Sequence, residues 1–494
     1  MINPVGELIL VLDAGTTSTR ALVFDRQGNV RAMHQQDIAQ HYPQDGWVEH
    51  DAAEIWDKTL ACARHVAIEA GGADRLACIG ITNQRETVVA WDAKTCEPLT
   101  RAIVWQDRRT APLCEELRDA GREEIVQRRT GLLLDPYFSA TKMRWMLDNV
   151  PAVADAASTG RLAFGTVESW LVAKLTGAHV TDASNASRTL LLPLDGKSWD
   201  EDLCALFGVP RSALPEVVDN HGEIARVPAD LLGHELAITG MAGDQQAATI
   251  GQACLSPGET KATYGTGAFV LTNMGTKVPA SQHRLLGTVL MQESGKRTYA
   301  LEGSVFVAGS LMQWLRDSLG LIASAGETEA MARSVETNGG VAIVPALSGL
   351  GAPHWQPEAR AAITGLTFAT GKAHVVRAAL EAMAMQTLDL AEAFAADGAP
   401  WERLRMDGGM AANDWMAQDM ADILAIEVER PDLVETTALG AAMLAGVGAG
   451  LFDSLAEAAD AMRGQVKCFS PAMDKPTREK RIALWQAALA RLSA

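Results

Sequence analysis

The sequence contains no hydrophobic run long enough to cross a bilayer. Its most apolar stretch, LGAAMLAGVGAGLF at residues 439–452, falls short of the roughly 20 residues that a spanning helix needs and consists largely of alanine and glycine. Such small side chains allow close backbone contact, so we predict a tightly packed, buried helix there. The lack of a longer apolar run argues against insertion into a membrane.

Disulfide and zinc frameworks are also missing. The seven cysteines are odd in number, and no two of them have the CxxC spacing typical of metal sites. Scattered thiols in a long chain are typical of a reducing compartment, and residues 1–4 show no basic or apolar leader pattern. These features predict a cytoplasmic protein.

Positive charge is outnumbered, with 43 Lys and Arg residues against 61 Asp and Glu residues. The formal net charge is −18 and the pI is about 5.0, and such a surface repels nucleic acid and anionic lipid. A nucleotide substrate is not excluded, because a binding site is local and Mg²⁺ can screen the phosphates.

The P-loop and Rossmann motifs are absent. The nearest approach to the P-loop pattern GxxxxGK[ST] is GLTFATGKA at residues 365–373, which has one residue too many and an alanine where serine or threonine is needed. No GxGxxG follows a predicted strand, and no GxSxG elbow occurs. Mechanisms that depend on a P-loop or a Rossmann fold are therefore poorly supported.

Strand-like and helix-like segments are interspersed, which indicates an α/β protein. Strand patterns occur at residues 8–13, 21–25, 78–83 and 88–92. The strand–turn–strand pattern at residues 11–25 has a weak echo at residues 261–273, just after a turn at residues 256–259. We therefore expect two related domains, residues 1–253 and 254–494, with a ligand cleft between them.

Two turns rich in glycine and threonine are candidates for holding phosphate. The first follows a strand and contains Asp13, Thr16, Thr17 and Ser18, and the second is centred on Thr266. Glycine permits close backbone approach, N–H and hydroxyl groups donate to phosphate oxygens, and a carboxylate such as Asp13 can hold Mg²⁺. Ordinary hairpin turns would use the same residue types.

Two further segments combine small residues with polar ones. Asp244 lies in MAGDQQAA (residues 241–248), where its carboxylate could accept the proton of an attacking hydroxyl. The local pattern alone favours a cap at the N-terminus of an alanine-rich helix. MDGGMAAN (residues 406–413) could place backbone against a nucleotide, or could be a glycine turn before a helix.

A charged pair and three aromatic residues could hold an acceptor. Arg85 and Glu86 are adjacent and opposite in charge, so together they could bind neighbouring hydroxyls of a polyol. A surface ion pair is the alternative interpretation. Trp105, Tyr137 and Phe269 could form an apolar wall, although such aromatics are more often core residues.

Segments along the whole chain together resemble the FGGY family of carbohydrate kinases. The likeness rests on DAGTTSTR (13–20), GITNQRET (80–87), TGLLLDPYFSATK (130–142), TDASNASRT (181–189), GMAGDQQAA (240–248), TYGTGAF (263–269), LEGSVFVAGSLMQWLRD (301–317) and MDGGMAAN (406–413). Residues 137–149 and 361–381 resemble the two family signatures. The resemblance implies the two-domain actin-like, ribonuclease-H-like ATPase fold with the active site in the interdomain cleft.

The resemblance also implies phosphorylation of a small polyol by MgATP, with glycerol as the expected acceptor and sn-glycerol 3-phosphate as the product. Asp244 corresponds to the family's general base and Asp13 to a carboxylate close to the metal. The positions that correspond to acceptor-binding residues are Arg85, Glu86, Trp105, Tyr137, Asp244, Gln245 and Phe269. The positions that correspond to nucleotide-binding residues are Thr16, Thr17, Ser18, Arg20, Thr266, Gly309, Gln313, Gly409 and Asn413.

Assembly and regulation follow from the same resemblance. A homodimer or homotetramer is the expected assembly. Some family members are inhibited by fructose 1,6-bisphosphate through a loop containing glycine and arginine before the catalytic aspartate, but residues 227–244 contain no arginine after Arg226. Asp230 stands where other members carry a phosphorylated histidine. We therefore expect neither form of regulation.

Three alternatives remain open. The chain could be an FGGY kinase for a pentulose or another polyol, or an actin-like ATPase that acts as a switch or assembly protein. It could also be an inactive binding module, which the presence of Asp244 disfavours. The set of acceptor residues favours glycerol, and ADP formation with different acceptors would separate these alternatives.

Overall fold

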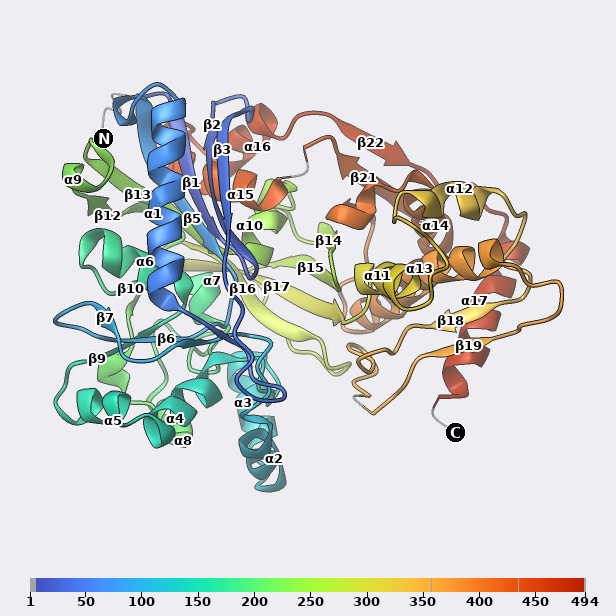
Figure 1. The fold of residues 1–494 in the computed structure, drawn as a ribbon, viewed down its shortest axis with the longest axis horizontal. Coiled ribbons are helices and arrows are strands. Elements are labelled where there is room, and N and C mark those ends of the chain that lie inside the picture. Colours follow the sequence, from blue (N-terminus) through green and yellow to red (C-terminus); the bar gives the residue numbers. More distant parts are fainter. Residues whose placement is uncertain (1–5, 357, 434, 493–494) are drawn as a thin grey trace.

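The computed structural model describes residues 6–356, 358–433 and 435–492. These residues form an α/β protein with two large sheets, one in each half of the chain (Figure 1). Residues 1–5, which include the segment examined for a leader pattern, lie outside the described part. Among the helices of the described ranges, none is long and apolar enough to cross a membrane.

The N-terminal half contains a six-stranded sheet with the order β12-β13-β5-β1-β2-β3. Its strands are β1 (Leu8–Ala14), β2 (Ser18–Phe24), β3 (Val30–Asp37), β5 (Leu76–Asn83), β12 (His221–Val227) and β13 (Leu236–Gly243). Every residue of β1 and β13 is buried. These strands are covered on both faces, which is why their sequences are mostly apolar. The strands predicted at residues 8–13, 21–25 and 78–83 are confirmed.

The C-terminal half contains a seven-stranded sheet with the order β16-β17-β15-β14-β20-β21-β22. Its strands are β14 (Thr260–Tyr264), β15 (Ala268–Gly275), β16 (Leu286–Glu293), β17 (Lys296–Val305), β20 (Arg403–Asp407), β21 (Glu427–Pro431) and β22 (Val466–Phe469). Small sheets are formed by β4 (Glu49–His50) with β8 (Ala102–Ile103), β6 (Val89–Asp92) with β7 (Glu97–Pro98) and β9 (Leu162–Gly165), β10 (Val180–Asp182) with β11 (Glu216–Val218), and β18 (Ala342–Val344) with β19 (Ala362–Thr364).

The two large sheets repeat one topology. In the first, the antiparallel hairpin β1–β2 is extended beside β1 by the parallel strands β5 and β13 and then by the antiparallel strand β12. In the second, the hairpin β14–β15 is extended beside β14 by the parallel strands β20 and β21 and then by the antiparallel strand β22. The echo between residues 11–25 and 261–273 therefore reflects a repeated unit of structure.

Helices cover both faces of the first sheet. The helices of the N-terminal half are α1 (Ala52–Glu69), α2 (Ala111–Asp119), α3 (Glu123–Thr130), α4 (Ser139–Asn149), α5 (Pro151–Ser158), α6 (Val167–Thr176), α7 (Ala183–Ala186), α8 (Glu201–Phe207), α9 (Ala229–Leu232) and α10 (Asp244–Gly251). Side chains of α1 and α6 form the core on one face of this sheet.

The other face of the first sheet is covered by helices from late in the chain. The chain passes to the second sheet between Gly251 and Thr260, and α15 (Thr436–Gly448) and α16 (Leu455–Met462) then return to the first sheet and complete its second core (Figure 1). Helix α15 confirms the buried helix predicted within residues 439–452, although it ends at Gly448.

The remaining helices pack with the second sheet around one large core. They are α11 (Gly309–Asp317), α12 (Glu327–Arg333), α13 (Lys372–Ala396), α14 (Asp414–Leu424) and α17 (Lys475–Ala490). Figure 1 shows these helices in the half of the molecule opposite to α1.

The backbones of α10 and α15 lie in close contact, and this contact fixes the position of α10. A Cβ atom on Gly440 would lie 1.8 Å from the carbonyl oxygen of Ala247, and one on Gly251 would lie 2.0 Å from the carbonyl oxygen of Thr436. Only glycine fits at such distances. The alanine- and glycine-rich sequence of α15 thus lets the two helices touch. This contact holds α10 in place, and Asp244 is the first residue of α10.

Candidate active site

The first Gly/Thr turn joins β1 to β2. The Gly15 N–H donates to the Ser18 carbonyl oxygen at 3.0 Å, and Asp13 faces Arg20 across the hairpin. Arg20 donates through Nε to Asp13 at 3.1 Å and through Nη1 to Glu435 at 2.5 Å. The backbone is thus an ordinary hairpin, and the carboxylate of Asp13 is paired with a guanidinium.

The second turn is joined to the start of α11. The carbonyl oxygens of Gly265 and Thr266 accept hydrogen bonds from the N–H groups of Gly309 and Ala308, both at 2.9 Å. A Cβ atom on Gly309 would lie 2.5 Å from the Gly265 oxygen, so this contact requires glycine. Gln313 lies one helical turn further along α11 and is exposed.

The 3₁₀ turn Gly409–Ala412 lies beside this contact. A Cβ atom on Gly309 would be 3.6 Å from the side chain of Met410 in this turn. Asn413 follows and caps α14, because its side chain accepts from the Met416 N–H at 3.0 Å. The predicted nucleotide residues of the C-terminal half therefore lie on adjoining segments.

Arg85 and Glu86 are both buried, with exposed fractions of 2% and 1%, so they are not a surface ion pair. They follow β5, and Glu86 has a φ of 61°. A non-glycine residue in the left-handed region is strained, and such strain is common at functional sites. The Glu86 carbonyl oxygen accepts from the Ser139 hydroxyl at 3.1 Å, which ties this loop to α4.

The three predicted aromatic residues lie together. The rings of Trp105 and Tyr137 are 5.6 Å apart, and those of Trp105 and Phe269 are 6.5 Å apart, each pair edge-on. The indole N–H of Trp105 donates to the Thr16 hydroxyl at 2.9 Å. Since Phe269 follows the second turn, this aromatic wall contacts both halves of the chain and adjoins the first Gly/Thr turn.

Asp244 is the first residue of α10, and Gly243 occupies the cap position. An Asp244 oxygen lies 3.4 Å from Arg85 Nε and accepts from the Gln245 N–H at 2.6 Å. Its side chain is 34% exposed and so remains reachable. The surrounding protein nevertheless raises the pKa of Asp244 to about 6, and the nearby Arg85 opposes this rise only in part.

Gln245 is held from the other half of the chain. Its side-chain oxygen accepts from Lys261 Nζ at 2.5 Å, and Lys261 also donates to the Thr263 hydroxyl at 2.8 Å. Burial lowers the pKa of the Lys261 ammonium group. This lysine had no assigned role in the sequence patterns.

Two buried charged residues were also missed by the sequence patterns. Arg188 and Glu302 both have an exposed fraction of 0%. Arg188 donates to Glu86 at 2.6 Å, and Glu302 accepts from Arg85 at 2.7 Å. The signal that could have found Glu302 is its place as the one charged residue in YALEGSV (residues 299–305), the buried end of strand β17, since such a charge needs a buried partner.

No cluster of three or more His, Cys, Asp or Glu side chains that could enclose a metal ion occurs in the described residues. Mg²⁺ typically uses one or two carboxylates and substrate phosphates. Asp13, buried at the end of β1, has the donor type for such a site.

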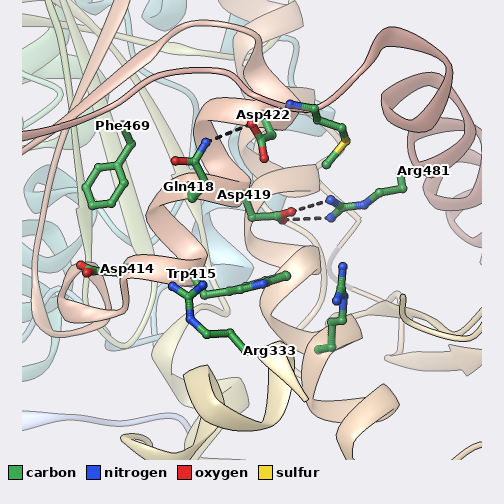
Figure 2. Close-up of a pocket in the computed structure, with 10 residues that line it drawn as sticks. Arg333, Asp414, Trp415, Gln418, Asp419, Asp422, Phe469 and Arg481 are labelled. Carbon is green, nitrogen blue, oxygen red and sulfur yellow. Dashed lines mark hydrogen bonds and ion pairs between the residues drawn. The ribbon is translucent and has the colours of Figure 1, made fainter. Parts of the chain in front are cut away.

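A separate pocket of about 350 Å³ lies among α12, α14 and α17 (Figure 2). It contains none of the predicted site residues. Its charged residues already have partners. Arg481 binds Asp419, Arg333 binds Glu329 and Arg377 binds Glu381. Asp414 pairs with Arg430, and Asp422 accepts hydrogen bonds from the Gln418 side chain and the Ala472 N–H. The pocket therefore offers no charged group that lacks a partner for a ligand to bind.

Comparison with known proteins gives the same family along the whole chain. The N-terminal domain of the FGGY family of carbohydrate kinases matches residues 8–251, and its C-terminal domain matches residues 260–449. The glycerol kinase of Alcanivorax borkumensis is 54% identical over 488 residues, which cover 98% of both chains. That of Dechloromonas aromatica is 53% identical, covering 98% of this chain and 97% of its own.

Solved structures agree with these matches. A Plasmodium falciparum glycerol kinase determined with ADP has a TM-score of 0.93 and 37% identity, covering 98% of both chains. A xylulose kinase from Rhodospirillum rubrum has a TM-score of 0.85 and 25% identity, also covering 98% of both chains. The protein described here belongs to the FGGY family of carbohydrate kinases.

Proposed function

We propose that the protein transfers the γ-phosphoryl group of MgATP to glycerol and forms sn-glycerol 3-phosphate and ADP. The observation that carries the proposal is the convergence of Arg85, Glu86 and Asp244 beside an aromatic wall that reaches the first Gly/Thr turn. The relatives named glycerol kinase, which match nearly the full length of this chain, support the choice of acceptor.

In this proposal Asp244 is the general base. Its carboxylate accepts the proton of a glycerol hydroxyl while the hydroxyl oxygen forms a bond to the γ-phosphorus, and the bond from that phosphorus to the β–γ bridging oxygen breaks. A base with a pKa of about 6 is ionised at neutral pH and still accepts a proton readily. Arg85 and Glu86 hold the other hydroxyls, together with Tyr137 and Gln245, and Trp105 and Phe269 contact the carbon chain.

The nucleotide would lie across the two Gly/Thr turns. Thr16, Thr17 and Ser18 would face its phosphates from the first turn and Thr266 from the second, with Gly309, Gln313, Gly409 and Asn413 beside the nucleoside. Asp13 would hold the Mg²⁺ that neutralises phosphate charge. Asp13 is paired with Arg20, so that pair would open or share its charge when MgATP binds. Arg20 would then be free to face the transferred phosphate.

Further proposals concern the molecule's organisation and setting. We propose residues 1–253 and 254–494 as the two domains, with α15 and α16 of the second packing on the sheet of the first. We also propose a cytoplasmic location and a homodimer or homotetramer without nucleic-acid partners. Light scattering of the purified protein tests the assembly directly.

The decisive experiment is an acceptor screen. ADP formation is measured with glycerol, dihydroxyacetone, xylulose and ribulose at equal concentrations. We expect the highest kcat/KM with glycerol. A preference for a pentulose would support a related FGGY specificity, and ATP turnover that no polyol changes would support an actin-like switch or assembly protein.

A further inference from the structure

Four buried charges form a closed group that includes the acceptor residues Arg85 and Glu86. Glu302 accepts from both terminal nitrogens of Arg85, at 2.7 and 3.2 Å, and from Arg188 at 3.0 Å. Arg188 donates through Nε to Glu86 at 2.6 Å, and Glu86 lies 3.8 Å from Arg85 Nε. Two cations and two anions therefore alternate, and each of the four contacts both neighbours of opposite charge.

The group is assembled from both halves of the chain. Arg85 and Glu86 follow β5 and Arg188 follows α7, whereas Glu302 lies in β17 of the second sheet. Strand β16, which pairs with β17, also packs on the N-terminal half, where Thr288 shares a hydrogen bond of 2.9 Å with Ser187. The second sheet thus reaches the acceptor site through β17, the neighbour of its edge strand β16.

Stability alone is a weak explanation for this arrangement. Taking four charges out of water carries a large desolvation cost, and apolar residues of similar size often give equal or greater stability. Burial itself disfavours ionisation of Glu302, but Arg188 and Arg85 outweigh it and lower the pKa of Glu302 to about 2. Glu302 is therefore ionised at neutral pH, and its hydrogen bonds to Arg85 and Arg188 fix where the two guanidinium groups lie.

The orientation of Arg85 depends directly on this anion. With both terminal nitrogens bound to Glu302, Arg85 turns its Nε edge toward Asp244, at 3.4 Å, and one terminal nitrogen toward the Tyr137 hydroxyl, also at 3.4 Å. Without the charge of Glu302, the nearest anions to Arg85 are Glu86 and Asp244. The guanidinium would then turn toward them and change the spacing of the groups that face the acceptor.

We propose that Glu302 and Arg188 are positioning residues, which orient Arg85 and Glu86 so that these can bind two neighbouring hydroxyls of the acceptor. Glu302 acts across the boundary between the two sheets, so the acceptor site is complete only when the C-terminal half is in place. This inference rests on the proposed function. It adds to that function the residues that determine how the acceptor-binding side chains are oriented.

The test compares the KM for glycerol with the KM for ATP in the variant Glu302→Gln. A rise in the first constant without a rise in the second is the split that the inference predicts. We expect the KM for glycerol to rise about tenfold or more, as for a lost charged hydrogen bond in a closed site, while the KM for ATP stays within about twofold of wild type. Arg188→Lys keeps the charge but cannot bond to both carboxylates with one planar fork, so we expect the same split. It provides a second test if Glu302→Gln does not fold.

Glu429→Gln is the matched control. Glu429 is also a buried carboxylate of the second sheet, and it pairs with Arg403, Arg405 and Arg463, none of which belongs to the acceptor site. We expect this variant to melt at a lower temperature than wild type, with both Michaelis constants unchanged.

Two results would overturn the inference. One is a glycerol KM within about twofold of wild type in a folded Glu302→Gln or Arg188→Lys protein. Such a change is smaller than the change in KM expected from the loss of a charged hydrogen bond. The other is an equal rise of both constants, which would indicate a general structural defect. Wild-type turnover with glycerol is measured first: if it is absent, the proposed function fails, and the split is measured with the acceptor that the screen identifies.

Discussion

Asp244 combines two properties that a catalytic carboxylate needs. Its side chain is partly exposed and can reach a ligand, yet the surrounding protein raises its pKa to about 6. The main cause is desolvation by the surrounding protein, to which the nearby carboxylate of Glu86 adds, whereas Arg85 opposes the rise. At neutral pH the carboxylate is ionised and retains an affinity for protons.

Replacement of the proposed base should therefore affect turnover and leave nucleotide binding intact. Asp244→Asn keeps the shape of the side chain and removes the proton acceptor, so we expect kcat with glycerol to fall about 10²–10⁴-fold. Steady-state kinetics and a nucleotide-binding titration measure the two effects. Asp230→Asn, at an exposed position, is the control. Near-normal kcat in Asp244→Asn would show that another group accepts the proton.

The same carboxylate predicts the acid limb of the pH profile. A base with a raised pKa loses its proton-accepting form as the pH falls through that pKa. We therefore expect kcat/KM for glycerol to be constant near neutrality and to decline about tenfold per pH unit below about pH 6. In Asp244→Asn the residual activity should lack this limb. A limb that persists unchanged in the variant would assign the titration to a different group.

At the scale of elements, the packing of α15 against α10 connects the C-terminal part of the chain to the proposed base. Gly440 lies where a Cβ atom would be 1.8 Å from the Ala247 carbonyl oxygen, a backbone atom that cannot turn aside. The two helices can only separate to accommodate a side chain there, and α10 carries Asp244 at its first position.

Gly440→Ala should accordingly lower both stability and activity. We expect the free energy of unfolding to fall by about 1–3 kcal/mol, the usual cost of overpacking, and kcat to fall because Asp244 moves with α10. Denaturant unfolding and steady-state kinetics measure the two effects. Val447→Ala in the same helix, at a half-buried position, provides the comparison. A Gly440→Ala protein with wild-type kcat would show that α10 tolerates the shift.

At the scale of the whole molecule, control by a sugar bisphosphate is not expected. A doubly phosphorylated ligand needs several N–H donors or cations to offset its desolvation. Arg226, at the start of the segment where such a loop would lie, already pairs with Glu223 at 2.6 Å and Glu235 at 3.2 Å. Asp230 and Glu235 add negative charge to the same surface.

Titration of fructose 1,6-bisphosphate into the glycerol assay tests this expectation by measuring inhibition of the reaction. We expect no saturable inhibition up to millimolar concentration, and no difference from an equal concentration of inorganic phosphate. Saturable inhibition by the bisphosphate alone would reveal a regulatory site, either at this segment or elsewhere in the assembly.

Much of the fold could be predicted from local patterns. The strands β1, β2 and β5 follow from apolar runs bounded by turns, and the buried helix α15 follows from its alanine and glycine content, because these features act within a few residues of the chain. The echo of one Gly/Thr turn in the other indicated the repeat that the two sheets share. The residues expected to bind the acceptor do lie together, as shown by the contacts among Arg85, Tyr137 and Asp244.

What only the tertiary structure decided is the set of partners behind those residues. Arg85 and Glu302 are 217 positions apart, and Arg20 and Glu435 are 415 apart. No local propensity pairs charges over such separations, because their contact depends on how the two sheets and the returning helix α15 are placed. The sequence by itself thus determined the strands, the turns and the kinds of groups in the site. The tertiary structure decided which charge faces which, and for fully buried charges such as Arg85 and Glu302 a partner is required, because burial of a lone charge is too costly.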